Sequence, residues 1–453
     1  MTTLKQSHRR ITQVPIMETA TLDIVKSHVE NSDKMKVLVL PALYREFQKS
    51  DGAQSAMEGI LPVLKNADYI DHIVLGLDGA NKDQYQEVLS LMKKADLPQK
   101  LHVLWNDGPE IANWRESLAS QDHDNRPLAP NKKGKGRNVW GCAGYAKALM
   151  EQEGVAPENT IIAMHDTDIV TYDEFLVARL FQPMSLDQDN ETKYVKGNYP
   201  RYTDEKLNGR VTRLFGPPLI DALARSIQDN PEYNTSGTRE LVHFFRSFQY
   251  MFSGEMAFSG DMLNDIELPN DYSMEIRILE QVYSATNDTM PNAIMDVQLA
   301  NRYDHHHQGM DGLEEMTTQI AAALFDIVNK KVELTAFDVN TIANKYANRG
   351  ELLAKKFGRV AEMNGLSSNV DKEEKSVVTF SKTLLKALER VEAGLEKPSH
   401  SWSMISHVAP DATTNLYKAV LRSGGILEKD IATVHGANDN TANAPGFISK
   451  LTR

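Results

Sequence analysis

The chain has 453 residues, of which 41% are hydrophobic and 25% are charged, the balance of an ordinary globular protein. Its 62 acidic and 50 basic residues give a formal net charge of −12, which argues against a general nucleic-acid binder because such proteins carry a basic field. The single cysteine, Cys142, excludes an intramolecular disulfide and a cysteine zinc site.

The ends and the hydropathy of the chain indicate where it works. Residues 1–23 lack the continuous apolar segment of a signal peptide, and no stretch approaches the roughly 18 apolar residues of a membrane span. We therefore expect a cytoplasmic protein without a membrane segment.

Four short apolar runs in the first third predict buried parallel strands, at residues 37–40, 73–75, 101–105 and 161–164. Pro41 closes the first run, and the others lead into polar or turn residues. Helical patterns between them, around 56–64 and 85–94, complete the alternation of strand and helix that predicts a parallel sheet. Ligands bind at the carboxyl ends of such strands.

Acidic side chains fall at these strand ends, namely Asp78, Asp107, Asp166 and Asp168. In an extended chain Asp166 and Asp168 project to the same side about 7 Å apart. Mg²⁺ or Mn²⁺ bridging a diphosphate suits such a pair, since hard cations prefer carboxylate and phosphate oxygens. The alternative is a solvated acidic loop.

Three further clusters are candidates for chemistry. The stretch 131–138 is a small basic loop with two glycines, suited to phosphate or else a solvated turn. Three consecutive histidines, 305–307, alternate in direction, so one of them, or the first and third, could reach a metal; otherwise they are exposed without a role. Glu255 lies between small and apolar residues and is either paired structurally or catalytic.

The later chain is mixed and then helical. Residues 194–199 predict a strand and 217–227 a helix. Apolar residues at spacings of three or four predict two later helices, through Leu313, Met316, Ile320, Leu324 and Ile327, and through Phe380, Leu384, Leu388 and Val391. Residues 367–375 between them predict a surface loop, and the tail after about residue 436 predicts a loose end.

The order of these motifs resembles that of glucosyl-3-phosphoglycerate synthases, retaining GT-A glycosyltransferases grouped with mannosyl-3-phosphoglycerate synthases. The motifs are Leu-Pro-Ala-Leu (40–43), Gly-Lys-Gly (134–136), Asp-x-Asp (166–168), Gly-Arg-Val-Thr (209–212), Ser-Gly-Glu-x-Ala (253–257) and His305. The resemblance implies an α/β GT-A fold, a Rossmann-like half with a mixed sheet, over residues 36–330. Its halves are 36–168 for the nucleotide sugar and 169–330 for the acceptor. Outside it lie an extension at 1–35, a helical region at 331–435 and a tail at 436–453.

The resemblance also implies roles for individual residues. Nucleotide-sugar contacts fall to Pro41, Ala42, Leu43, Glu46, Asp78, Lys135, Asp166 and Thr167. Metal ligands would be Asp166, Asp168 and His305, with Asp168 also catalytic. Glu255 would lie near the anomeric centre as a catalytic residue. The acceptor phosphate would bind Gly209, Arg210, Val211 and Thr212, with His307 as a further acceptor contact.

Two departures from the family pattern stand out. Tyr44-Arg45-Glu46 replaces the usual Asn-Glu-Glu, and His306 and His307 replace the usual Arg-Asn after the metal-binding histidine.

The expected reaction moves glucose from UDP-glucose or GDP-glucose to the 2-hydroxyl of 3-phosphoglycerate, with Mg²⁺ or Mn²⁺ and in a homodimer. Retention could follow front-face attack or a covalent intermediate. The alternatives are a mannosyltransferase on the same acceptor, a nucleotidyltransferase and a non-catalytic nucleotide-sugar binding protein.

Overall fold

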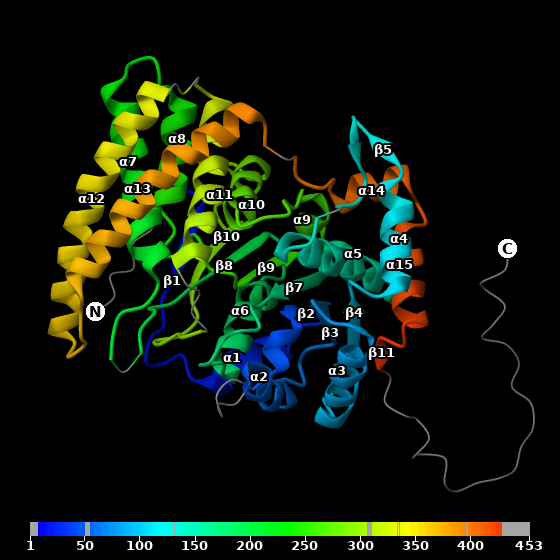
Figure 1. The fold of residues 1–453 in the computed structure, drawn as a ribbon. Helices are drawn as coiled ribbons and strands as arrows, with labels where there is room; N and C mark the ends of the chain where they lie inside the picture. Colours follow the sequence, from blue (N-terminus) through cyan, green and yellow to red (C-terminus); the bar gives the residue numbers. More distant parts are fainter. Residues whose placement is uncertain are drawn as a thin grey trace, which may run out of the picture.

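The computed structural model describes residues 8–49, 55–130, 132–203, 205–305, 310–332, 334, 336–395 and 397–427. Within them a nine-stranded sheet crosses the molecule in the order β1-β10-β8-β9-β7-β2-β3-β4-β11 (Figure 1). The strands are β1 (Ile11–Val14), β2 (Met35–Leu43), β3 (His72–Asp78), β4 (Lys100–Trp105), β7 (Thr160–Met164), β8 (Tyr194–Asn198), β9 (Met256–Ser259), β10 (Ile294–Gln298) and β11 (Ile426–Leu427). A hairpin of β5 (Asp122–His123) and β6 (Arg126–Pro127) lies outside this sheet.

The sheet is parallel except at two strands. β9 runs antiparallel to both of its neighbours, and β11 runs antiparallel to β4 at one edge. All four predicted strands are present as β2, β3, β4 and β7, and they pair in parallel. The expected end of the first strand at Pro41 was wrong. β2 continues to Leu43, because Pro41 pairs with Gly76 of β3 without needing to donate a backbone hydrogen bond.

Helices cover both faces of the sheet, as two separate apolar clusters show. One face packs against α1 (Leu22–Glu30), α2 (Ala56–Lys65), α3 (Lys82–Ala95) and α6 (Glu174–Leu186), seen below the strands in Figure 1. The opposite face packs against α4 (Pro109–Ala119), α5 (Lys135–Glu153), α9 (Gly260–Asp265), α10 (Met274–Ala285), α14 (Trp402–Val408) and α15 (Ala412–Arg422). The fold is therefore a three-layer α/β arrangement, as expected for GT-A.

Local sequence accounts for the helix starts near the binding face. Ser55 and Glu58 form a capping box at the start of α2, and Asn81 and Gln84 form another at α3. Each box satisfies two backbone N–H groups that a helix start otherwise leaves without partners. These helices follow strands β2 and β3, so their starts lie at the carboxyl edge of the sheet.

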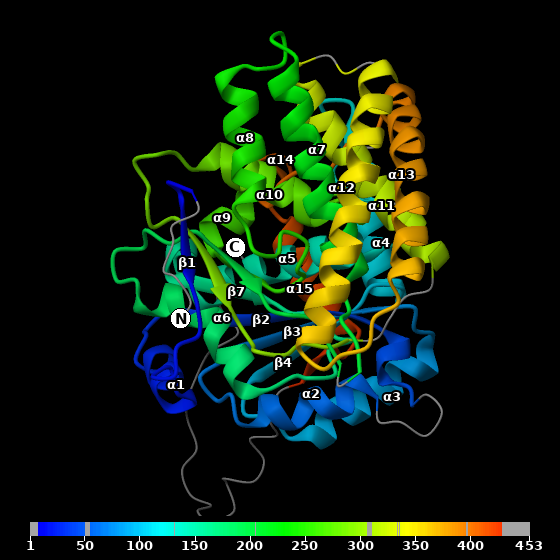
Figure 2. The same ribbon diagram turned by 90° about the vertical axis from the view of Figure 1, so that its left-hand side faces the viewer.

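A helical bundle rises from one end of the sheet, as Figure 2 shows most clearly. It contains α7 (Gly216–Asp229), α8 (Ser236–Arg246), α11 (Met310–Asn329), α12 (Ala336–Met363) and α13 (Val370–Ala393). The predicted helices at 217–227 and through the two apolar stripes are all present. The predicted surface loop at 367–375 was wrong in part, because Asn369 caps a helix that begins at Val370.

No helix in the described part of the chain is long and apolar enough to span a membrane. The predicted loose tail lies outside the described residues.

Candidate active site

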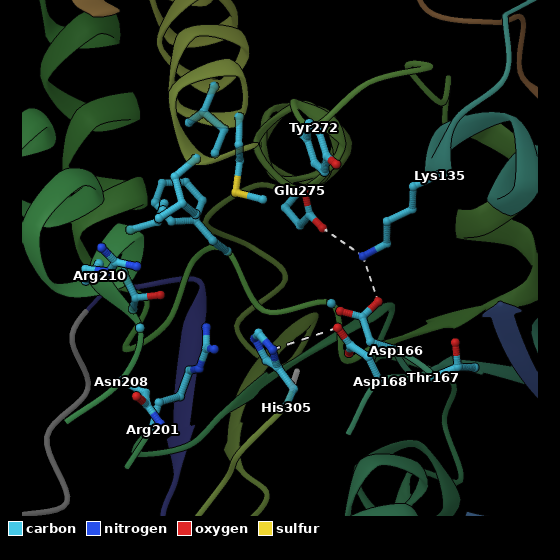
Figure 3. Close-up of a pocket in the computed structure, with 18 of the residues that line it drawn as sticks. Lys135, Asp166, Thr167, Asp168, Arg201, Asn208, Arg210, Tyr272, Glu275 and His305 are labelled. Carbon is cyan, nitrogen blue, oxygen red and sulfur yellow. Dashed lines mark hydrogen bonds and ion pairs between the residues drawn. The ribbon is translucent and has the colours of Figure 1, made fainter. Parts of the chain in front are cut away.

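A pocket of about 1180 Å³ opens at the carboxyl ends of β2, β3 and β7 and extends to the helical bundle. Figure 3 shows its two ends. Lys135 and Asp166 lie on one side, Arg201, Asn208 and Arg210 lie on the other, and His305 lies between them. The structure therefore brings residues from both predicted halves of the transferase region into one cavity.

The end of β2 forms one wall of the pocket with Pro41, Ala42 and Leu43, and Glu46 follows in the turn Tyr44–Phe47. Two polar side chains fix this wall. The Thr167 hydroxyl donates to the carbonyl of Pro41 at 3.1 Å, and the Asn138 amide donates to the carbonyls of Ala42 and Gly76 at 3.3 and 2.9 Å. Asn138 thus ties helix α5 to the ends of β2 and β3.

Asp78, at the end of β3, also lines the pocket, but its carboxylate is already engaged. The Arg137 guanidinium donates to Asp78 at 3.0 Å and to Asp107 at 3.1 Å, and Lys133 lies 2.8 Å from Asp107. Burial raises the pKa of Asp78 above its ordinary value. This network joins the carboxyl ends of two neighbouring strands to the basic segment before α5.

The basic segment was expected to be a loop, but Lys135 is the first residue of α5 and Asn131 lies outside the described residues. Gly136 permits close packing there, since a Cβ atom would lie 1.8 Å from the carbonyl oxygen of Pro269. The Lys135 ammonium lies 2.7 Å from Asp166 and 3.4 Å from Glu275. Burial disfavours its charge, but these carboxylates outweigh burial and raise the pKa of Lys135.

The two carboxylates of the Asp-x-Asp motif have different surroundings. Burial opposes ionisation of Asp166, but the Lys135 ammonium outweighs burial and lowers the pKa of Asp166. Burial, together with the charges of Asp166 and Glu46, raises the pKa of Asp168 to about 8. One oxygen of Asp168 is buried without a hydrogen-bond partner, and the other lies 3.8 Å from His305 Nδ1.

These donors suit a hard divalent cation, because Asp168 has one buried oxygen without a hydrogen-bond partner, and its second oxygen faces the His305 imidazole across 3.8 Å. Among the described residues no complete set of three or more side-chain ligands is already gathered. A cation here would therefore take further ligands from substrate and water. His306 and His307 lie outside the described residues.

Glu255 lies completely buried at the entrance to β9. It accepts hydrogen bonds from the hydroxyls of Tyr199 and of Tyr303, the latter at 2.8 Å, and the two rings stack with centroids 3.6 Å apart. Burial and the charge of Asp166 raise the pKa of Glu255. Gly254 leaves room for the Asp166 side chain beside Glu255, because a Cβ atom at position 254 would lie 2.2 Å from Asp166 Oδ2.

The Gly-Arg-Val-Thr segment 209–212 lines the far end of the pocket. Gly209 has φ of 71°, a left-handed conformation that glycine adopts without steric cost, and the chain then enters a turn of π-helix at Val211–Phe215. Arg201 packs against Gly209, donates to the Tyr250 hydroxyl at 3.0 Å and keeps a buried Nε without a hydrogen-bond partner. This end of the pocket is cationic.

Several residues of the site were not singled out from the sequence, namely the lining residues Tyr199, Arg201, Asn208, Tyr250 and Glu275, and Tyr303, which donates to Glu255. One signal was available for Tyr199 and Arg201, because Tyr199 ends the predicted strand at 194–199 and Arg201 follows two residues later. Glu275 and Tyr303 carry no comparable local signal, since their roles come from pairing across long sequence separations.

Comparison with known proteins places this site in a family. No family model matches the chain. A glucosyl-3-phosphoglycerate synthase of Persephonella marina is 32% identical over 394 residues, covering 85% of this chain and 89% of that protein. The namesake of Methanococcoides burtonii is 27% identical over 397 residues, with the same coverage. A Mycobacterium tuberculosis glucosyl-3-phosphoglycerate synthase, solved with Mn²⁺, UDP and phosphoglyceric acid, is 19% identical, covers 70% of this chain and 85% of its own, and has a TM-score of 0.45.

The mixed sheet with its reversed strand β9, and the pocket with carboxylates at its strand ends, agree with the glycosyltransferase class to which both relatives belong by name. Within that class, the identity and coverage of the Persephonella relative are decisive. The chain belongs to the glucosyl-3-phosphoglycerate synthase family.

Proposed function

We propose that this enzyme transfers glucose from a nucleoside-diphosphate glucose to the 2-hydroxyl of 3-phosphoglycerate. The observation that carries the proposal is that one pocket has two different ends. A wall at the end of β2 forms one end, Gly209–Thr212 lie at the cationic other end, and Asp168 lies between them. A donor bound at the first end and an anionic acceptor bound at the second would meet near Asp168, with the buried Glu255 next to the pocket-lining Gly254.

The nucleotide-sugar donor would bind at the end of the pocket that β2 forms. Pro41, Ala42, Leu43 and Glu46 would hold base and ribose, with Asp78 and Thr167 supporting that wall, and Lys135 would contact the diphosphate. Asp166 would orient Lys135 through their 2.7 Å ion pair. Lysine suits this task because it supplies a compact point charge to phosphate.

Asp168 and His305, with Asp166 beside them, would hold Mg²⁺ or Mn²⁺. When bound, that ion would neutralise charge developing on the departing diphosphate. The unpaired oxygen of Asp168 supports this assignment. The carboxylate must also lose the proton that its raised pKa favours before it can act as a ligand.

Glu255 is the proposed catalytic carboxylate near the anomeric carbon. The hydroxyls of Tyr199 and Tyr303 fix its position, and burial strengthens its electrostatic effect on positive charge developing in the sugar ring. The family resemblance implies retention of configuration at this carbon.

The acceptor would bind at Gly209, Arg210, Val211 and Thr212. Backbone N–H groups, a guanidinium and a hydroxyl together make a suitable phosphate site. His307 remains a proposed acceptor contact on sequence grounds alone. A nucleotidyltransferase is less favoured, since it would need a glycine-rich loop where β2 ends in Pro41-Ala42-Leu43.

We also propose a cellular compartment, an oligomeric state and a transferase domain for this enzyme. We place it in the cytoplasm as a homodimer, with residues 36–330 as its transferase domain. Leu352 and Met363 of α12 and Val378 of α13 are exposed apolar side chains that a second copy would cover in such a dimer. Light scattering on the purified chain tests the dimer, and a monomer at micromolar concentration would contradict it.

The function is tested by incubating purified enzyme with Mg²⁺ and 3-phosphoglycerate in the presence of UDP-glucose, GDP-glucose or GDP-mannose in separate reactions. Mass spectrometry then identifies the released nucleotide and the product. We expect glucosyl-3-phosphoglycerate from at least one glucose donor. Product from GDP-mannose alone would support the mannosyltransferase alternative instead, and donor binding without transfer to any acceptor would support the non-catalytic alternative.

A further inference from the structure

The acceptor end of the pocket does not stop at the Gly-Arg-Val-Thr segment. It continues to the connection between α12 and α13. We call this connection, together with the first residues of α13, the α12–α13 turn and define it as residues 364–373. Ser367, Ser368, Asn369 and Lys372 of this turn line the pocket, and Phe357 of α12 does so as well. The helical region therefore provides part of the cavity wall at the end where the acceptor is proposed to bind.

The α12–α13 turn is fastened to the segment that carries the proposed phosphate site. The backbone N–H and hydroxyl of Ser367 both donate to the carbonyl of Glu205, at 2.6 and 2.7 Å. On the other side of the segment, Arg213 pairs with Glu373 at 2.6 Å and stacks on the Phe357 ring at 5.1 Å. These contacts bracket residues 209–212, so the turn and the segment form one continuous wall.

Charge distinguishes Lys372 from its neighbour on this wall. The carboxylate of Glu373 is already offset by Arg213. For Lys372, by contrast, no carboxylate among the described residues lies within ion-pair distance. Arg201 lines the same end, with a buried Nε that lacks a hydrogen-bond partner in the described chain. Lys372 and Arg201 therefore bring positive charge to this end that no carboxylate of the described residues pairs with.

We infer that the α12–α13 turn is part of the acceptor site and that Lys372 is a specificity-determining residue that binds the acceptor's phosphate. The inference rests on the proposed function and deepens it. A phosphate bound over residues 209–212 would lie beside the turn, and the Lys372 ammonium on its flexible four-carbon stem would complete a charge cluster with Arg201 and Arg210. The helical region thereby selects phosphorylated acceptors.

The test compares Lys372→Ala and Lys372→Arg with Lys375→Ala, a charge-matched control one turn further along α13 that does not line the pocket. We expect Lys372→Ala to raise the KM for 3-phosphoglycerate about tenfold, in the lower part of the range for a lost charged hydrogen bond. The KM for the nucleotide sugar and the melting temperature should stay unchanged. Lys372→Arg should restore most of the loss, and Lys375→Ala should behave as wild type.

Unphosphorylated glycerate, at concentrations high enough for turnover, provides the second arm. Lys372→Ala should leave kcat/KM for glycerate unchanged, because the lost contact is to the phosphate. An unchanged KM for 3-phosphoglycerate in Lys372→Ala would overturn the inference, and so would an equal loss with both acceptors. Failure of the proposed function is a separate result, since the wild-type enzyme itself would then form no product from 3-phosphoglycerate.

Discussion

Asp168 combines two properties that rarely occur together at a surface carboxylate. One of its oxygens is buried without a hydrogen-bond partner, and its pKa is raised to about 8 by burial and by Asp166. Both costs would fall away if Asp168 holds a divalent cation as proposed, because a nearby cation favours the charged carboxylate. Metal binding would then also stabilise the folded protein.

From this follows the first prediction. Asp168→Asn, which keeps the shape and removes the charge, should lower kcat by roughly a hundredfold or more and raise the metal concentration needed for half-maximal activity. Excess chelator should abolish wild-type activity, and Mg²⁺ or Mn²⁺ should restore it. Asp189→Asn, at an exposed position, serves as the matched control. Full activity of the wild-type enzyme in chelator would disprove the metal assignment.

The second prediction concerns Arg210 at the opposite end of the pocket. Arg210→Ala should raise the KM for 3-phosphoglycerate by roughly 10–150-fold, the value of a lost charged hydrogen bond, and leave the KM for the nucleotide sugar nearly unchanged. Steady-state kinetics with each substrate varied in turn measures the split. The exposed Arg239→Ala is the control. A parallel rise in both KM values would place Arg210 in a structural role.

At the scale of single residues, the sequence predicted which residues line the pocket better than it predicted which side chains they pair with. Asp166 and Asp168 were found because a carboxylate pair after an apolar strand has few structural explanations. Glu275 was missed, since it lies on α10 and meets Lys135 only through the tertiary fold. The pairing of Lys135 with both carboxylates could not follow from a local pattern.

At the scale of elements, the parallel strands β3 and β4 carry a buried pair of histidines. His72 Nδ1 lies 3.1 Å from His102 Nε2, and His102 Nδ1 lies 3.0 Å from the Tyr145 hydroxyl. Burial lowers the pKa of both rings, that of His102 to about 3. They are neutral in the folded protein at pH values where they would be protonated in the unfolded chain.

The third prediction is the resulting pH dependence. Since the folded pKa lies below the unfolded value of about 6.5, the unfolded state binds more protons as the pH falls, and stability declines below that value. His102 alone should remove about 1.4 kcal/mol between pH 7.5 and 5.5. Urea denaturation at both pH values measures it. His102→Gln should show a smaller decline than wild type, and His123→Gln the same decline; equal declines in all three would contradict the account.

Helices and strands were predicted from the sequence where apolar residues recur at a regular period. The prediction failed where a polar segment suits either a loop or the start of a helix. The strands β2, β3, β4 and β7 and the stripes of α11 and α13 were all recovered. The polar run 367–375 was assigned to a loop, but residues from Val370 onward form the exposed first turn of α13, which Asn369 caps. Charged residues suit either setting, so composition could not separate them.

At the scale of the whole molecule, residues 397–427 return from the helical bundle to the sheet (Figure 1). Trp402 of α14 is 1% exposed, stacks on Trp140 of α5 at 4.7 Å and donates to the Trp140 carbonyl at 2.9 Å. Gly144 makes room for it, since a Cβ atom there would lie 2.0 Å from the Trp402 ring. One side chain thus anchors residues 397–427 to helix α5 beside the sheet.

The fourth prediction tests this anchor. Trp402→Ala should lower the free energy of unfolding by about 3–5 kcal/mol, because it opens a large cavity against α5 and removes a buried hydrogen bond. Leu421→Ala, on the exposed side of α15, should change it by less than about 0.5 kcal/mol. The midpoint of denaturant unfolding distinguishes the two. A loss equal to that of Leu421→Ala would mean that the segment packs loosely.

The return of residues 397–427 to the sheet was not predicted, because the apolar residues of α14 and α15 are too few to specify which surface they cover. The pairing of β1 with β10 was likewise not predicted, since a four-residue strand carries little information about a partner so far along the chain.

During translation, the two edges of the sheet become paired only after late strands have emerged. β1 must wait for β10, where Ile11 pairs with Ile294, and β4 keeps an open edge until Ile426 and Leu427 cover it. An emerging chain therefore exposes unpaired strand edges for most of its translation, and such edges are templates for misassembly. A ribosome-bound fragment that ends before residue 426 would contain every residue that lines the pocket and would still expose the edge of β4, so this edge stays open to misassembly after the active site can form.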